Sequence, residues 1–206
     1  MRTPLEVLKV RHQRAVVLCH KVGYKSCAEL RDAERLYGGG PLVAADVATL
    51  GMILRTNGLP RMKEVYLRSN GLGDAAMQAL YEGLGRGAAP SLRFLSLAYN
   101  KFGPAGAEAL AAALGRGAMP KIEILCLYHN PIGNRGVAAL AAPLRKMPAL
   151  NQLFLNNCKI GDEGVASLVD SLGKDDFKKC TRLDLDYNKI TDAGAEPTRS
   201  QGGVDF

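Results

Sequence analysis

Aliphatic residues recur at fixed intervals through most of this 206-residue chain. The recurring pattern is L-x-x-L-x-L-x-x-N-x-L, in which apolar and other positions alternate before an asparagine or a cysteine. Its five copies follow one another at a nearly constant interval, a register that chance does not produce. The starting residues are Met62, Leu92, Ile122, Leu150 and Cys180. The pattern therefore predicts one structural unit that is repeated along the chain.

Each unit is predicted to hold a short strand, a turn and a helix. Alternation with a period of two places one row of strand side chains in a core and leaves the other row free. Beyond the turn the apolar spacing becomes helical, and Gly115 or Pro120 is expected to end the helix of the second unit. One face of that helix is expected to carry Ala105, Ala109, Leu110, Ala113 and Leu114.

One polar position in each unit is predicted to be structural. A side-chain amide there can hydrogen-bond buried turn backbone, whose unpaired groups cost roughly 1–3 kcal/mol each. Cysteine takes this position in the fourth unit, a replacement that the pattern allows. The expected ladder is Asn70, Asn100, Asn130, Cys158 and Asn188.

These units resemble the ribonuclease-inhibitor-like subfamily of leucine-rich repeats. The shared features are a unit of about 30 residues, the turn sequence N-x-[LIF]-G and a full helix in each unit. The turns concerned are Asn70-Gly71-Leu72-Gly73-Asp74, Asn130-Pro131-Ile132-Gly133 and Cys158-Lys159-Ile160-Gly161-Asp162. The resemblance covers residues 42–195 and implies an α/β solenoid, a short curved right-handed β-α horseshoe arc. It does not specify a function.

The chain is expected to have three parts. Residues 1–41 do not fit the pattern and are predicted to form a helical N-terminal cap, with a second helical piece near Cys27–Tyr37. Residues 42–195 are expected to hold a half-repeat followed by the five copies, and residues 196–206 a flexible tail. The half-repeat is expected to supply only a helix, because residues 32–37 do not match the strand positions at the regular repeat offset.

Composition and charge narrow the class of protein. Apolar residues make up 47% of the chain, aromatic residues only 6%, and there is no tryptophan, which suits a core of leucine and alanine. The net charge of +7 could attract an anionic partner, although lysines and arginines that aid solubility are the simpler interpretation. A basic cap helix for a membrane or nucleic acid is disfavoured, because acidic residues interrupt it and no aromatic residues interleave with it.

Targeting and redox signals favour an intracellular, cytoplasmic protein. No run of apolar residues is long enough to form a membrane span, and the N-terminal sequence does not resemble a secretory signal. The five cysteines form an odd set without a C-x-x-C pair, which favours reduced thiols. Cys158 and Cys180 occupy repeat positions and are expected to be buried, whereas Cys126 is expected on the open face of a strand.

The chain offers little for catalysis, and no metal or cofactor is expected. The histidines are His12, His20 and His129. None of them has acidic or cysteine partners at metal-ligand spacing. Cys126 and His129 could suggest a nucleophile and its base, but both belong to one strand and turn, and no oxyanion hole accompanies them. Asp184, Asp186 and Asp192 could suggest a cation site, although solvated acids on an exposed strand are the simpler interpretation.

The free strand row and the turn beside it are predicted to form a concave binding face. Its 20 positions hold four of the seven tyrosines and two of the five phenylalanines. Exposed aromatic groups are typical of binding sites, although some, such as Tyr99 and Tyr187, could pack along the turn. The candidate partner-binding residues are Tyr66, Arg68, Phe94, Tyr99, Ile124, Tyr128, Phe154, Asn156, Asp184 and Asp186.

Three functions compete. The leading hypothesis is a non-catalytic module that binds another protein, with no small-molecule substrate. The second is a regulator of a small GTPase, because Ran GTPase-activating proteins have similar repeats, although those proteins are longer and end in an acidic tail. The third is a subunit or fragment of a larger repeat assembly, joined through a C-terminal edge where Leu183, Leu185 and Ile190 are expected to be poorly covered. Ribonuclease inhibition is disfavoured, since such inhibitors are longer, acidic and rich in cysteine.

Overall fold

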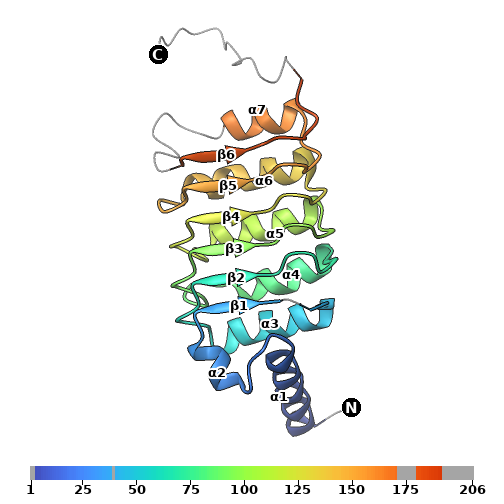
Figure 1. The fold of residues 1–206 in the computed structure, drawn as a ribbon, viewed down its shortest axis with the longest axis vertical. Helices are drawn as coiled ribbons and strands as arrows, with labels where there is room; N and C mark the ends of the chain where they lie inside the picture. The colour runs from blue at the N-terminus through green and yellow to red at the C-terminus, as the bar shows by residue number, and fades with distance from the viewer. Residues whose placement is uncertain (1–2, 39, 171–179, 192–206) are drawn as a thin grey trace.

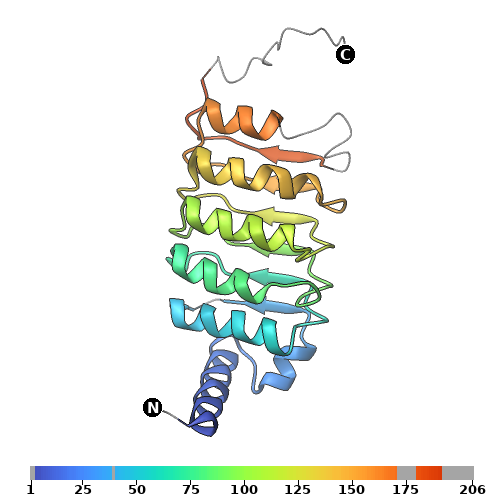
Figure 2. The ribbon, with the colours of Figure 1, turned by 180° about the vertical axis from the view of Figure 1, so that it is seen from behind.

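The computed structural model describes residues 3–38, 40–170 and 180–191. In these ranges six parallel strands form one open sheet in sequence order, and helices cover one of its faces (Figure 1, Figure 2). The strands are β1 (Arg35–Tyr37), β2 (Glu64–Tyr66), β3 (Phe94–Ser96), β4 (Ile124–Cys126), β5 (Gln152–Phe154) and β6 (Arg182–Asp184). The helices are α1 (Pro4–Lys21), α2 (Cys27–Asp32), α3 (Ala44–Thr56), α4 (Asp74–Gly83), α5 (Pro104–Gly115), α6 (Gly133–Arg145) and α7 (Asp162–Asp170). The predicted α/β solenoid is confirmed.

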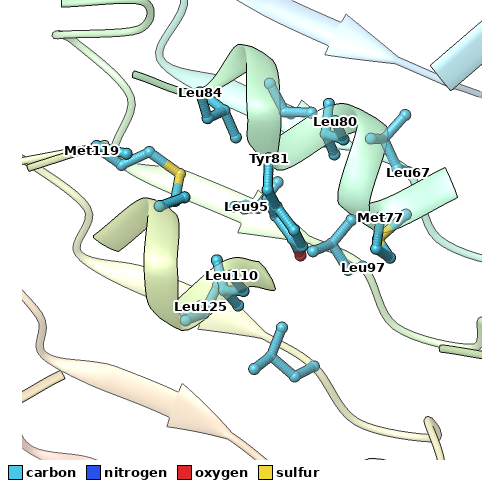
Figure 3. Packing of buried hydrophobic residues seen from close by; sticks show 14 of the residues in the cluster. Leu67, Met77, Leu80, Tyr81, Leu84, Leu95, Leu97, Leu110, Met119 and Leu125 are labelled. Carbon is cyan, nitrogen blue, oxygen red and sulfur yellow. The ribbon is translucent and has the colours of Figure 1, made fainter. Parts of the chain in front are cut away.

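Equivalent residues of successive repeats lie side by side in the sheet. Leu95 pairs with Val65 on one side and with Leu125 on the other, and all three are buried. Their side chains enter the layer between the sheet and α3–α7, where Figure 3 shows Leu95 and Leu125 beside leucines of α4 and α5. The core is therefore continuous from repeat to repeat, because each repeat buries its apolar face against its neighbours.

The first repeat is complete, so the expectation that residues 32–37 add no strand is wrong. Leu36 is fully buried and pairs with Val65, and the N–H groups of Lys63 and Glu64 donate to the carbonyl of Glu34. The first repeat is one residue shorter than the next, so the regular offset misaligns Leu36 with Val65. The second helical piece also ends earlier than expected, because α2 stops at Asp32 and the chain turns into β1.

The cap is fixed to the first repeat by burial and by one ion pair. Leu18 and Cys19 of α1 are fully buried. At the end of α1, the Lys21 ammonium lies 2.7 Å from the Asp46 carboxylate of α3. The same carboxylate accepts the N–H of Val43 and thereby closes the start of α3. The C-terminal end of α1 therefore contacts the first repeat, and the rest of the helix extends away from it (Figure 1).

Contacts between neighbouring helices determine which of their residues are buried. The buried face of α5 includes Ala107 and Ala111, whereas Ala105 and Ala109 are only partly buried. The face is shifted because α5 lies between α4 and α6 as well as on the sheet. At the α3–α4 contact, a Cβ built on Gly83 would lie 2.0 Å from the carbonyl oxygen of Gly51, so only glycine permits this approach.

The last described repeat is less covered than the others. Leu183 is 41% exposed, whereas its partner Leu153 in β5 is fully buried. Cys180 is half-buried, although burial was expected, while Cys158 is fully buried. The end of the predicted repeat region, residues 192–195, and the predicted tail at 196–206 lie outside the described residues.

Candidate functional site

Side-chain amides hold the turns that follow the strands. The Asn100 Nδ2 donates to the carbonyls of Leu67 and Leu97, both at 2.9 Å. The Leu97 carbonyl also accepts from the Asn130 Nδ2 at 2.9 Å, so it joins two neighbouring repeats. In the opposite direction, the Asn100 Oδ1 accepts the N–H of Asn70 at 3.1 Å. These shared bonds fix the positions of neighbouring turns relative to one another beside the concave face.

The same arrangement continues toward the C-terminal repeats with one substitution. Asn188 donates to the carbonyls of Leu155 and Leu185 and accepts the N–H of Cys158 at 2.9 Å. The Cys158 thiol makes only weak bonds, to the Leu127 carbonyl at 3.4 Å and to the Asn156 carbonyl at 3.6 Å. Burial raises the pKa of this thiol to about 12, so it remains protonated at neutral pH.

The residue before each ladder position adopts the left-handed backbone conformation. These residues have φ values of 53–59° and are Ser69, Tyr99, His129, Asn157 and Tyr187. Such a conformation costs about 1 kcal/mol or more for a residue other than glycine. Because it recurs in every repeat that has a ladder residue, we attribute it to the turn geometry that the ladder bonds hold.

The first aromatic cluster crosses β1, β2 and β3. The Tyr37 and Tyr66 rings stack with centroids 4.8 Å apart, and the Tyr66 ring lies 4.7 Å from that of Phe94. The Tyr66 hydroxyl donates to the Glu64 carboxylate, which also pairs with Arg35 at 3.1 Å. The Tyr66 ring is thus held in place by its hydroxyl, which bonds to a carboxylate that Arg35 neutralises. The faces of the rings lie on the concave side.

Tyr37 was not among the expected binding residues. It follows Leu36 just as Tyr66 follows Val65, so a search that allowed one shorter repeat could have found it in the sequence. Its side chain is 51% exposed. A hollow of about 560 Å³ lies beside it and is lined by Tyr37, Gly38, Gly40, Pro41, Tyr66, Arg68 and Ser69.

The second aromatic cluster lies over β4 and its neighbours. The Tyr99 ring stacks on the His129 imidazole at 4.2 Å and meets the Tyr128 ring edge-on at 5.4 Å. Tyr128 in turn meets Phe154 edge-on at 6.5 Å. The His129 Nδ1 and the Asn157 Nδ2 form a hydrogen bond of 2.8 Å. We call Tyr99, Tyr128, His129 and Phe154 the central aromatic cluster.

Two arginines lie over these rings. The Arg68 guanidinium is 5.4 Å from the centre of the Tyr99 ring, and the Arg182 guanidinium is 4.9 Å from that of Phe154. Arg182 also pairs with the Asp184 carboxylate at 3.5 Å. Both cations therefore rest on aromatic faces, an arrangement that stabilises them by about 0.5–1 kcal/mol at exposed sites.

The remaining expected residues are less available. Ile124 is half-buried between Phe94 and Gln152 of the adjacent strands. The side-chain oxygen of Asn156 is buried and has no hydrogen-bond partner among the described residues. The Asp186 side chain is exposed, and the backbone N–H of Asp186 donates to the Asp184 carboxylate.

The concave row is not uniformly exposed. Ser96, Ala98 and Cys126 occupy the free row but are 4%, 0% and 7% exposed, because small side chains lie below the rings around them. Cys126 therefore lies in the concave row, but it is buried there, so the expectation that this residue is open to solvent is wrong. Burial raises the pKa of its thiol to about 11, and the Arg68 charge only partly offsets this. A reactive thiolate is disfavoured at neutral pH.

Within residues 3–38, 40–170 and 180–191, histidine, cysteine and acidic side chains do not gather in groups of three that could hold a metal ion. Asp192, considered for a cation site, lies outside these ranges. In the same part of the chain, every helix is too short or too polar to cross a membrane.

The comparison with protein families agrees with this architecture. The family model described as "Leucine Rich repeat" matches residues 88–111, 118–141, 148–169 and 181–197. No curated protein matches the chain. The crystal structure of an internalin from Listeria monocytogenes is similar at 20% identity with a TM-score of 0.47, over 77% of this chain and 36% of that one. The chain therefore spans about a third of the length of the internalin. The repeats and their parallel sheet give this chain the fold of an α/β leucine-rich-repeat solenoid, and the family model matches four of the repeats.

Proposed function

We propose that this chain is a non-catalytic interaction module that binds another protein on its concave strand face. The observation that carries the proposal is the gathering of aromatic side chains on that face. Two clusters of rings in contact with one another lie over β1 to β5, one over β1 to β3 and one over β4 and its neighbours, with Tyr37 51% and Tyr99 44% exposed. Tyrosine and phenylalanine are enriched in the interfaces of protein complexes, where they supply large contact areas.

The setting of these rings also favours binding. They project from strands and ladder-held turns, and they contact one another, so their conformations are restricted before a partner arrives. Preorganisation of this kind reduces the side-chain entropy lost on association, about 0.5–1.5 kcal/mol for each side chain that would otherwise be immobilised. A partner would therefore gain most of the contact energy of the rings.

The test compares three forms of the protein. Wild type, a concave variant (Phe94→Ala, Tyr128→Ala, Phe154→Ala) and a control variant are used to capture partners from cell lysate. The control, Leu5→Ala, Leu8→Ala, Val17→Ala, removes exposed apolar residues of α1 instead. Circular dichroism and thermal melting verify that all three are folded.

We expect partners that are retained by wild type and by the control but lost by the concave variant. A purified partner should then bind the concave variant at least tenfold more weakly in calorimetry. Equal retention by the concave variant would contradict the proposal and direct attention to the cap or to the edge at β6.

Two finer properties are proposed with this function. We infer that the repeats are of the ribonuclease-inhibitor-like type, which the helices of 10, 12 and 13 residues in α4, α5 and α6 support. We also propose that the protein works in a reducing, cytoplasmic compartment, since all five cysteines are free thiols in the structure. Regulation of a small GTPase and assembly into a larger particle stay predictions from the sequence.

A further inference from the structure

One column of residues crosses the concave face from β2 to β6. It consists of the second residue after each strand, namely Arg68, Ala98, Tyr128, Asn156 and Asp186. Backbone hydrogen bonds of 2.9–3.0 Å set these residues side by side, because the N–H that follows each member donates to the carbonyl of the next member. The column therefore runs perpendicular to the strands, beside the carboxyl ends of the sheet.

Among the described residues, the two ends of this column carry opposite charges that have no ion-pair partner. Elsewhere on the described concave face, Arg35 pairs with Glu64 and Arg182 pairs with Asp184. The Arg68 guanidinium rests on the Tyr99 ring, and neither it nor the Asp186 carboxylate has an ion pair in the described ranges. When the paired charges are counted as neutral, the described concave face keeps one positive charge beside β2, on Arg68, and one negative charge beside β6, on Asp186.

The distance between these ends sets a spacing for the partner. Four strand steps of 4.7–4.9 Å separate Arg68 from Asp186, about 19 Å in total. An extended chain advances about 3.3 Å per residue, so it covers this distance in about six residues. Tyr99 and Tyr187 border the column on one side and are 44% and 86% exposed. Because these side chains limit the width of the column, it suits a narrow, extended segment.

We propose that this column binds an extended segment of a partner protein with an acidic side chain over Arg68 and a basic one over Asp186. The two charged residues lie about six positions apart in the segment, and apolar side chains between them rest on Tyr128 beside the small Ala98. This inference rests on the proposed function, since it names the chemistry of the partner that the aromatic clusters bind.

The charges and the rings have different tasks in this interaction. Exposed ion pairs contribute little to affinity but select orientation and register, whereas buried aromatic contacts supply most of the binding energy. Reversal of one charge should therefore weaken binding by about threefold to tenfold, and loss of the rings should weaken it more.

The first experiment selects random 12-residue peptides displayed on phage against the wild-type protein. Peptides that also bind the concave variant (Phe94→Ala, Tyr128→Ala, Phe154→Ala) are removed. We expect the remaining peptides to carry an acidic and a basic residue five to seven positions apart around an apolar centre. Ring-dependent peptides without this spacing would overturn the charge inference and leave the proposed function intact. A selection without any ring-dependent peptide would overturn both.

The second experiment uses the best selected peptide and a copy in which its acidic residue is replaced by lysine, with affinities measured by fluorescence anisotropy. The copy should bind the wild-type protein about threefold to tenfold more weakly than the selected peptide does. It should bind the Arg68→Glu variant more tightly than it binds wild type, whichever direction the peptide runs. The control protein, Arg55→Glu with Glu82→Lys, exchanges exposed charges on α3 and α4 and should bind both peptides as wild type does. Equal binding of the copy to wild type and to Arg68→Glu would overturn the inference.

Discussion

The two faces of the sheet are built from alternate residues of the same strands, yet they follow different rules. Toward the helices, equivalent positions are nearly identical from repeat to repeat, as with Leu67, Leu97 and Leu127, all fully buried. Toward the concave side, the positions beside them change from Arg68 to Ala98 and then to a tyrosine. The core must repeat because each layer packs on a copy of itself, whereas the concave face has no such constraint and can specialise.

The largest expected loss of stability should distinguish the two faces of the sheet most clearly. Leu97→Ala removes a fully buried side chain from the shared core and should lower the free energy of unfolding by about 2–5 kcal/mol. Phe94→Ala in the same repeat removes a ring that is only half-buried, and it should cost about 1 kcal/mol. Urea denaturation followed by circular dichroism measures both. Similar losses for the two variants would mean that the concave rings belong to the core.

The ladder lies between the faces and should show an intermediate effect. Asn100→Ala leaves the amides of Asn70 and Leu72 without their acceptor, whereas the Leu97 carbonyl keeps its bond from Asn130. The expected loss of stability is about 2 kcal/mol.

Asn157→Ala provides the matched control for the ladder. This side chain also lies in a turn, but it is exposed and, among the described residues, bonds only to the His129 ring. Because alanine tolerates the left-handed conformation of this residue less well than asparagine does, its replacement should cost about 0.5–1 kcal/mol, still less than that of Asn100. Equal losses for the two asparagines in urea denaturation would contradict a special role of the ladder.

Cys126 tests whether a concave position can behave as core. Its thiol has a pKa of about 11, raised by burial from the ordinary value of 9.0. Between these values the unfolded chain releases the proton and the folded chain retains it, so ionisation stabilises the unfolded state. Stability should therefore fall as the pH rises from about 9 toward 11, and it should fall less steeply in Cys126→Ala. Parallel urea titrations across this range make the comparison, and identical slopes would argue that the thiol is accessible.

A further small effect is expected within the core itself, where one substitution should raise stability. The Tyr81 hydroxyl is fully buried without a hydrogen-bond partner in the described structure, and its ring lies close to Leu95 and Leu97 (Figure 3). Tyr81→Phe removes this unpaired group and should raise the free energy of unfolding by about 0.5–1 kcal/mol. A lower melting temperature than wild type would show that the hydroxyl is bonded.

Much of the architecture could be predicted because it depends on local spacing. Alternating leucines, the ladder position and the helical pattern each occur within one repeat, and together they specify a strand, a turn and a helix. The strand at Leu36 was missed because its repeat is one residue shorter than the next, and a search at a fixed offset cannot recognise that change. The buried face of α5 was misplaced because its position depends on the two helices beside it.

The sequence by itself determined which residues could reach the concave face, since strand alternation assigns them to one side. Only the tertiary structure decided which of them are accessible and charged. Cys126 became buried, Tyr37 joined the first aromatic cluster, and in the described part of the chain Arg68 and Asp186 are left without an ion-pair partner. The physical reason is that these outcomes depend on the sizes and charges of neighbours a full repeat away in the chain, which become adjacent only when the repeats stack.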